Sequence, residues 1–350
     1  MPRSETTRHP RLEILANGTA LAGAIEAEVT SNNHYAADRF RARLALDADP
    51  GAIAFWSTAG EIILDIRFGL DGGAISAIQG AVDRVEIDPI QRVLRLDGRD
   101  LTARLIEART HESFVNRTAS EIAELLAARH ELSTDVTATK TPVGRYYQNE
   151  HDRITLGQFS RAMSEWDLLT WLARQEGFDV FVRGTSLHFG PSPRNAAVRP
   201  IWPGDVMALR LERALTLARD IEVVVKSWNA RQQSAFTQTA RAAAARRGDG
   251  KSGSAQRHVL VRPNLTQEQA LKLAQTTLAE LTRHRMVLHA TMPGDLSLAP
   301  RDALSLGGTA TAFDQIYYVD EVSRRLSVQH GFVQQVTARN DSAPAQTTPR

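Results

Sequence analysis

The sequence contains no cysteine, and this absence removes several kinds of chemistry at once. A chain without thiols forms no disulfide, has no thiolate nucleophile and offers no thiolate ligand to a metal ion. Lysine is also scarce, because only 4 of the 42 basic residues are lysine and the other 38 are arginine. Genome base composition can produce this bias, so it carries little functional weight.

Long apolar runs and an excess of one charge are missing too. No stretch approaches the roughly 18 apolar residues that a membrane span needs, and residues 1–15 hold no apolar core of signal-peptide length. The 42 basic and 40 acidic residues leave a net charge of +2, without the basic excess on which nucleic-acid and membrane-surface binding depends. We therefore expect a chain made in the cytoplasm without a signal peptide, with no membrane span and no sequence-specific nucleic-acid binding.

What the sequence does contain is an ordinary globular balance. Hydrophobic residues make up 42% of the 350 residues and charged residues 23%. A chain of this length is too long for one ordinary domain and predicts two or three.

The first hundred residues have the alternation of β-strands. Apolar side chains occupy every second position over 25–29, 40–46 and 62–68, with Ile63 as the one apolar residue on the polar side. Short turns rich in Asn, Asp and Gly separate these runs, and residues 91–100 read as a closing strand. This spacing predicts an antiparallel barrel or sandwich.

Helical signals follow further along the chain. Three capping boxes predict helix starts, formed by Thr118 with Glu121, Ser164 with Asp167, and Thr266 with Gln269. Gly177 stands where a C-terminal glycine would end the second helix, and residues 178–189 then read as a hairpin. Strand-like runs return after residue 205, and a Gly/Ser/Ala/Arg-rich segment at 238–256 reads as a mobile loop.

These signals predict a mainly β protein with α/β insertions, and no internal sequence repeat is strong enough to quote. The domain plan is a flexible N-terminal tail at 1–10, a first β-barrel-like domain at 11–105, an α/β insertion at 106–200, a second β-barrel-like domain at 201–230 and 285–340, an inserted mobile loop plus helix at 231–284, and a disordered tail at 341–350.

A search for catalytic or metal-binding patterns yields none. His130-Glu131 lacks the second histidine of a zinc motif, and there is no Gly-x-Ser-x-Gly elbow. His284 and His289 are better explained as structural side chains than as ligands of one metal ion. Glu150-His151-Asp152 is best explained as solvated charge in a polar loop. We predict no catalytic, cofactor-binding or metal-binding residues, and no cofactor.

Three short features have mainly structural explanations. The tripeptide Arg247-Gly248-Asp249 matches an adhesion motif, but an Arg/Gly-rich loop produces it by chance. Trp166 and Trp171 lie at helical spacing among apolar residues, which favours core packing over a sugar platform. Tyr146-Tyr147 lies in a loop and is more ambiguous, since it also suits an interface anchor.

The order of the elements resembles the late control protein D family of bacteriophage tails, the baseplate hub proteins. The family is related to the hub half of type VI secretion spike proteins. The matching phrases include G-x-D-x-x-x-x-L at 98–105 and S-x-x-D-x-L-x-x-L-A-x-x-x-G-F-x-x-x-V at 164–182, with others at 118–127 and from Tyr318 onward. Arg324 and Arg325 stand where the family usually has a histidine. The resemblance covers about residues 12–340.

The resemblance implies a structural, non-enzymatic role. Two β-barrel-like domains per chain would form a pseudo-hexameric ring in a homotrimer, adapting the sixfold tail tube to a threefold spike. It implies as partners the tail tube protein, a separate trimeric spike protein, and baseplate wedge and tape-measure proteins, in a virion or phage-like particle. Two alternatives stay open: a tail-tip enzyme that degrades cell wall, and a carbohydrate- or receptor-binding module, which the aromatic content of 6% weakens.

Overall fold

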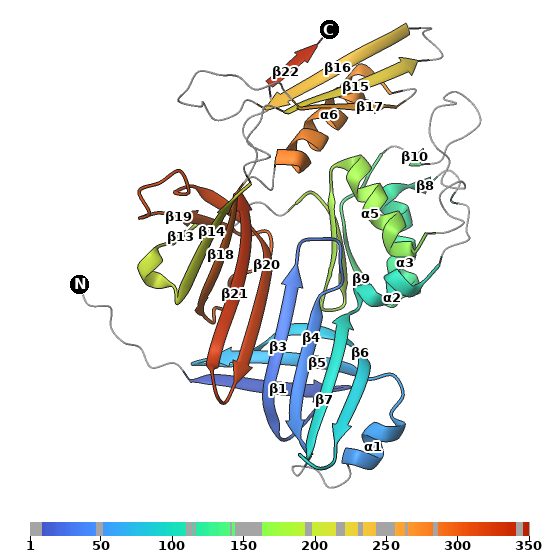
Figure 1. Ribbon diagram of the computed structural model, residues 1–350. Coiled ribbons are helices and arrows are strands. Elements are labelled where there is room, and N and C mark those ends of the chain that lie inside the picture. The colour runs from blue at the N-terminus through green and yellow to red at the C-terminus, as the bar shows by residue number, and fades with distance from the viewer. Residues whose placement is uncertain are drawn as a thin grey trace.

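The computed structural model of the chain is mainly β, as the alternation predicts. It describes residues 9–46, 52–109, 114, 117–140, 142–143, 163–192, 198–214, 221–229, 234–242, 256–262, 265–282, 286–340 and 346–349. Figure 1 shows two groups of long strands, a helical unit beside them and a further small unit near the C-terminus.

The first β module occupies the predicted N-terminal β region. Its strands are β1 (Pro10–Ala16), β2 (Thr19–Ala20), β3 (Ala24–Asn32), β4 (Arg39–Ala45), β5 (Ile63–Leu70), β6 (Ala74–Asp88) and β7 (Val93–Asp100). They pair antiparallel in the order β3-β4-β7-β6-β5-β1-β2. Alternate side chains such as Val29, Phe40 and Leu96 meet in one buried core. The sheet curls, because β1 and β5 pass behind β3, β4 and β7 and β1 contacts β3 (Figure 1).

Two details of this module were not predicted by the alternation of apolar and polar residues. Ile63, the apolar residue on the polar side of its run, packs against the core of the neighbouring α/β unit. Helix α1 (Ala52–Thr58) interrupts the strands between β4 and β5, and its Trp56 is buried in the module core. A helix of this length leaves too short a periodic pattern to be recognised.

The second β module lies mostly near the C-terminus. It consists of β13 (Arg199–Ile201), the short 3₁₀ helix η2 (Pro203–Asp205), β14 (Ala208–Arg213), β18 (Met286–Pro293), β19 (Ala303–Leu306), β20 (Ile316–Ser327) and β21 (Gly331–Asn340). The strand order is β14-β18-β21-β20, with β19 and β13 continuing from β20. Its core contains Leu288, Tyr317 and Val336. Strand β20 also pairs with β3, so the two β modules share one 13-stranded sheet.

The two β modules repeat one strand topology. In chain order, β1, β3, β4, β5, β6 and β7 correspond to β13, β14, β18, β19, β20 and β21, and every pairing within the first set recurs in the second. The one difference in direction is that β1 is antiparallel to β5, whereas β13 is parallel to β19. The repeat consists of equivalent pairings between strands that are distant in the chain. This explains why the sequence itself shows no clear internal repeat.

Local details support the equivalence of β6 and β20. Each strand has a bulge against its hairpin partner, between Val82 and Arg84 in one and between Val319 and Glu321 in the other. Residues 82–85 read Val-Asp-Arg-Val and residues 319–322 read Val-Asp-Glu-Val. The aspartate of each pairs with an arginine of the next strand, Arg99 at 2.6 Å and Arg339 at 2.9 Å.

An α/β unit follows the first β module. Its elements are α2 (Thr102–Glu107), β8 (Arg117–Thr118), α3 (Ala119–Arg129), β9 (Ser133–Val136), β10 (Pro142–Val143), α5 (Glu165–Glu176), β11 (Asp179–Arg183) and β12 (Ser186–Gly190). The predicted capping boxes at Thr118 and Ser164 are confirmed. Gly177 ends α5 with φ 70°, a left-handed conformation that glycine adopts without strain. The predicted hairpin is β11–β12, and β9 adds a parallel strand beside β12.

The prediction for residues 201–284 was wrong in part. The helix predicted from Thr266 is α6 (Gln267–Thr282), with both capping hydrogen bonds present. The predicted mobile loop at 238–256, however, overlaps the end of β16 (Ser234–Ala242) and the first residue of β17 (Gln256–Val261). The rest of that loop, residues 243–255, lies outside the described part of the chain. Strands β16 and β17 pair with β15 (Ile221–Asn229), which therefore lies outside the second β module. Sequence alternation marks a strand but does not tell which distant strands it joins.

The disordered tail predicted at 341–350 was also wrong in part, because residues Gln346–Pro349 form β22, antiparallel to β16. Pairing of this kind uses backbone groups, which composition does not reveal. Helix α6 covers one face of the sheet β17-β15-β16-β22 and buries Val223, Ala240 and Leu278 there.

Candidate functional site

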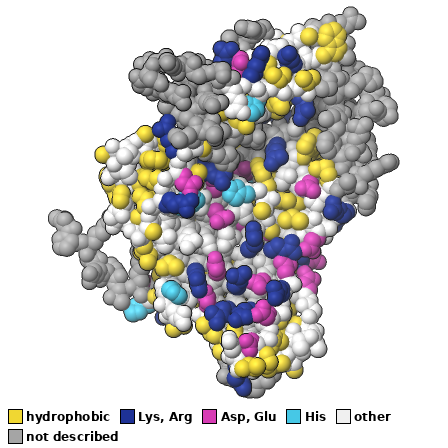
Figure 2. Space-filling view, in the orientation of Figure 1, with side chains coloured by type: hydrophobic (Ala, Val, Ile, Leu, Met, Phe, Trp, Pro, Cys, Tyr) yellow, Lys and Arg dark blue, Asp and Glu magenta, His cyan; other side chains and the backbone are white. Residues whose placement is uncertain are grey.

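The polar face of the first β module carries paired charges of both signs. Arg41 on β4 donates to Asp97 on β7 at 2.8 Å, and Arg99 holds Asp83 with two hydrogen bonds of 2.6 and 2.8 Å. Further pairs on this face join Arg43 to Glu26, Arg84 to Glu86, and Arg95 to Glu86. Figure 2 shows basic and acidic side chains intermixed over these strands. Exposed pairs contribute at most about 1 kcal/mol each, so their main effect is a wet, nearly neutral surface.

The polar face continues across the junction of the two β modules, which we call the seam. Here β3 and β20 pair over seven residues. Thr30 Oγ1 donates to Ser323 Oγ at 3.0 Å, Ser323 Oγ donates to Glu28 at 3.1 Å, and Arg325 pairs with Glu26. On the opposite side of the same strands Val29 is buried. The seam therefore joins the modules with backbone pairing, a buried face and a hydrated face.

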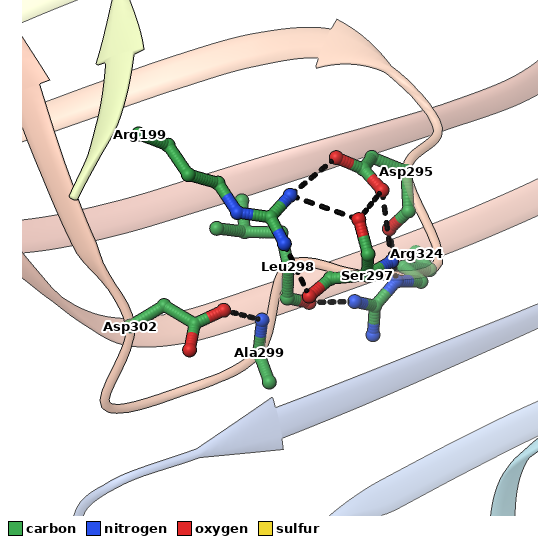
Figure 3. Close-up of polar contacts among 7 residues, drawn as sticks. All are labelled: Arg199, Asp295, Ser297, Leu298, Ala299, Asp302 and Arg324. Carbon is green, nitrogen blue, oxygen red and sulfur yellow. Dashed lines mark hydrogen bonds and ion pairs between the residues drawn. The ribbon is translucent and has the colours of Figure 1, made fainter. Parts of the chain in front are cut away.

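Arg324 points to the buried side of the seam and holds the loop between β18 and β19. Its Nε donates to the carbonyl of Asp295 at 3.1 Å, and its Nη2 donates to the carbonyl of Leu298. Arg199 binds the same loop, because its Nη1 donates to Asp295 Oδ2 at 2.9 Å and to Ser297 Oγ at 2.8 Å (Figure 3). Burial lowers the pKa of the Arg324 guanidinium, and the nearby Asp295 opposes that shift. The arginine at this position therefore anchors a loop at the seam.

We expect Arg324→Met to destabilise the protein by about 2 kcal/mol or more, because a buried carbonyl group and a partly buried one lose their donor. Chemical denaturation measures this loss, and limited proteolysis reports whether residues 294–302 open first. Arg325→Met is the matched control, since Arg325 lies on the exposed side of the same strand and should cost less than about 1 kcal/mol. Equal losses for both variants would contradict the anchoring role.

A cavity of about 320 Å³ lies where both β modules meet the α/β unit. Arg301, on the loop between β18 and β19, donates from Nε to Asp179 on β11 at 3.0 Å. Its guanidinium lies 4.1 Å from the ring centre of Phe181. Tyr35, after β3, receives the Trp166 indole hydrogen bond on its carbonyl at 2.7 Å. These contacts hold three parts of the chain around one polar space.

Two buried carboxyl groups line this cavity. Burial raises the pKa of Asp38 to about 6, against the opposing effect of hydrogen bonds from Asn32 and Ser31. Burial raises the pKa of Asp100 well above its ordinary value, and the nearby Asp38 charge adds to the shift. Asp100 also accepts from the Thr102 backbone (3.2 Å) and hydroxyl (3.0 Å), at the start of α2. The Asp of the G-x-D-x-x-x-x-L phrase thus links β7 to α2.

The two tryptophans flagged in the sequence belong to a core. Trp166 is 4% exposed, Trp171 is half-buried, and both pack in the α/β unit, which confirms the packing interpretation. His130 lies 2.6 Å from buried Glu165, which Arg129 also approaches at 2.5 Å. These contacts tie α3 to α5.

Another residue that the sequence singled out, His289, makes polar contacts within the second β module. His289 contacts Thr337 at 3.3 Å and Glu212 at 3.5 Å. The remaining flagged residues lie outside the described part of the chain, namely Tyr146, Tyr147, Glu150, His151, Asp152, Arg247, Gly248, Asp249 and His284. Among the described residues no cluster of three acidic or histidine side chains suits a metal ion. Within the same residues, no helix is long and apolar enough to cross a membrane.

The sequence did not reveal the seam or the cavity residues. Asp100 belongs to a matching phrase and Arg324 departs from one, but nothing local marks these residues or Asp38 as buried charges. Arg324 is buried where β20 pairs with β3, almost 300 residues away in the chain. Asp38 and Asp100 are buried in the cavity where both β modules meet the α/β unit.

Solved structures with the same fold include phage tail proteins and a type VI secretion component. The tail protein of Neisseria meningitidis MC58 matches with a TM-score of 0.70 at 14% identity, over 95% of this chain and 96% of that one. The 43 kDa tail protein of prophage MuSo2 from Shewanella oneidensis matches at 0.69 and 16% identity, over 94% and 98%. An Escherichia coli component of the type VI secretion system matches at 0.54 and 12% identity, over 93% and 76%.

These similarities define the class of fold: this is a protein with the fold of phage tail proteins, so the predicted resemblance is confirmed at that level. A family model matches residues 60–327, and the chain belongs to the family described as the Alg8 N-terminal domain. No curated protein sequence matches the chain.

Proposed function

We propose that this chain is the structural hub of a phage tail or a phage-derived contractile injection particle. In this role a homotrimer adapts the sixfold tail tube to the threefold spike. The observation that carries the proposal is the internal repeat, in which two β modules of one strand topology are joined edge to edge. Three chains in a closed ring would present six similar modules, whereas the chain itself would repeat three times.

The polar face of the sheet supports the same role. A hub ring surrounds a channel that stays wet, and its lining has to let other molecules pass without binding them strongly. Mixed, paired and exposed charges, such as Arg41 with Asp97, make a hydrated surface without a strong field of one sign. We propose that this face lines the channel.

The remaining parts of the proposal follow from the fold of the structural neighbours. The chain would act as a late control protein D-type, non-enzymatic component of a virion or phage-like particle. The phage tail proteins and the type VI component among its neighbours support a tail tube protein and a spike protein as partners. Baseplate wedge and tape-measure proteins would contact the outer parts of the ring.

The solution mass of the purified chain tests the proposal. Light scattering should give three times the 38.6 kDa mass of one chain, and negative-stain images of the same peak should show rings with a central hole. A chain that remains a monomer, alone and with the spike protein of the same particle, would contradict the hub. Cleavage of cell wall by the purified protein would favour the enzyme alternative.

A further inference from the structure

Among the described strands, the repeat leaves two edges without partners, and they are equivalent to the two strands that form the seam. β20 contributes residues 321–327 to the seam, and its equivalent β6 ends with residues 84–88. β3 contributes residues 26–32, and its equivalent is β14. Among the described strands, β14 pairs only with β18, and only β7 pairs with β6 beyond residue 82.

Backbone hydrogen bonds at equivalent positions of β6 and β20 confirm the alignment of the two strands. The amide of Val82 donates to the carbonyl of Ile62 at 3.0 Å, and the amide of Val319 donates to the carbonyl of Asp302 at 2.8 Å. Directly after these positions, β20 turns to β3, where the amide of Asn33 donates to the carbonyl of Asp320 at 2.7 Å. The corresponding edge of β6 has no strand of the described chain beside it.

Burial differs between the seam and the two open edges in the expected way. Val319 and Val322 on β20 are fully buried, but the equivalent Val82 and Val85 on β6 are only half-buried. The ion pair of Asp320 leaves that aspartate side chain 1% exposed, whereas the equivalent Asp83 is 35% exposed. The first β module thus has the buried face of a seam without the strand that would cover it.

The edge of β14 shows the same deficit. Ala27 and Val29 on β3 are fully buried, whereas the equivalent Leu209 and Leu211 on β14 are half-buried. Met207, next to this edge, is 65% exposed. Helix α1 contacts β6 and leaves Ile53 and Phe55 exposed, so a covering strand would meet further apolar surface there.

We infer that β14 of one copy of this chain pairs antiparallel with residues 84–88 of β6 in the next copy, as a second seam between chains. This inference rests on the proposed ring and names the contact that closes it. The interface is head-to-tail, because each copy offers one β14 edge and one β6 edge. Six seams of one kind, three within chains and three between them, then alternate around the ring.

The equivalence of the strands gives the register of the second seam. On the apolar side, Ile87 faces Leu211. The equivalent pair in the seam within one chain is Arg324 opposite Val29. On the polar side Asp88 faces Arg210, which reverses the charges of Arg325 opposite Glu28 and keeps them complementary.

A further polar pair in this register is Glu86 opposite Glu212. Each of these carboxylates already has an arginine partner within its own chain, Arg95 or Arg84 for Glu86 and Arg210 for Glu212. The corresponding pair of the internal seam is Thr30 and Ser323, whose hydroxyl oxygens lie 3.0 Å apart. Side chains at this pair of positions are therefore close enough for a disulfide if cysteines replace them.

Disulfide trapping tests the second seam, and the absence of native cysteine makes every cross-link assignable. The variant Glu86→Cys/Glu212→Cys should form covalent dimers and trimers on mild oxidation. A bond within one chain is disfavoured, since six strands separate β6 from β14 in the sheet. Thr30→Cys/Ser323→Cys is the positive control and should close within one chain. Glu86→Cys/Gln335→Cys is the negative control, because Gln335 is exposed on the central strand β21.

The outcomes separate the second seam from the proposed hub. Cross-linked trimers of the Glu86/Glu212 variant only, with the internal control closed, support both. A trimeric mass without this cross-link overturns the strand pairing and leaves the hub standing. Covalent chains longer than trimers support the pairing but overturn the closed ring. A monomer without cross-links, both alone and with the spike protein of the same particle, overturns both.

A charge variant provides a second measurement. Arg210 is largely exposed, with 76% of its side chain accessible, and it forms an ion pair with Glu212 on its own strand, so Arg210→Glu should fold normally. It would place a glutamate opposite Asp88 and beside Glu86, and the trimer should dissociate at least ten times more readily. A folded Arg210→Glu variant that keeps the parental trimer affinity would overturn the proposed register.

Discussion

Replacing Gly80 by alanine should destabilise the first β module by about 3 kcal/mol or more. Gly80 lies on β6 opposite Asp100 of β7, where the strands approach closely beside the bulge. A Cβ atom at this position would meet the carbonyl oxygen of Arg99 at 2.0 Å and the Cα of Asp100 at 2.9 Å. Backbone atoms held in a ladder cannot move aside as a flexible side chain can. Equilibrium denaturation of the purified variant measures the loss.

Gly98→Ala provides an independent measurement at the same crossing. Its Cβ would lie 2.2 Å from the carbonyl oxygen of Ala81 and 2.3 Å from the Phe40 ring. Gly60→Ala and Gly204→Ala are matched controls, because neither site has an atom within 4 Å or a positive φ. The controls should stay within about 0.5 kcal/mol of the parent protein. Similar stabilities for all four variants would show that the β6–β7 crossing relaxes freely.

The stability of the protein should rise as the pH falls from about 7 to 5, through Asp38. Its folded pKa is about 6, above the ordinary 3.8, so the folded state keeps a proton that the unfolded state has lost. Between these two values the folded state binds more protons, and stability falls as the pH rises; above the folded pKa the whole penalty is present. Two pKa units correspond to on the order of 3 kcal/mol. The buried Asp100 acts in the same direction.

Asp38→Asn should remove the part of this pH dependence that Asp38 contributes and stabilise the protein at pH 7. The asparagine oxygen can still accept the 2.8 Å hydrogen bond from the Asn32 amide without a buried charge. Asp314→Asn should instead destabilise the protein at neutral pH. Hydrogen bonds from Thr309 lower the pKa of Asp314, so its charged form stabilises the fold at that pH. Denaturation midpoints between pH 4 and 8 measure both effects. A parallel profile for Asp38→Asn and the parent would refute the role of Asp38.

Much of the local structure was predictable, because its causes are local. The capping boxes at Thr118 and Ser164 use side chains and backbone groups three residues apart, so the sequence contains both partners. Gly177 ends α5 for a conformational reason that belongs to the residue itself. Polar and apolar alternation likewise marked β3, β4 and β5.

Other elements were missed or misplaced because their partners are remote. β15 read as a strand, but its membership in the sheet with β16 and β17 depends on the pairing of three segments. β22 pairs through its backbone, and its polar composition suggested disorder. Arg324 looked like a departure from a family phrase until the loop carbonyls that it binds were located.

By itself, the sequence determined the mainly β class, the positions of the capped helices and the resemblance to phage tail proteins. These depend on residue order, periodicity and short-range hydrogen bonding, which are present in the chain before it folds. Only the tertiary structure decided that the two β modules repeat one topology, that β3 and β20 join them, and that no other described strand covers the equivalent edges on β6 and β14. Pairing of strands far apart in the chain is selected by the burial of whole faces, and no local segment encodes that choice.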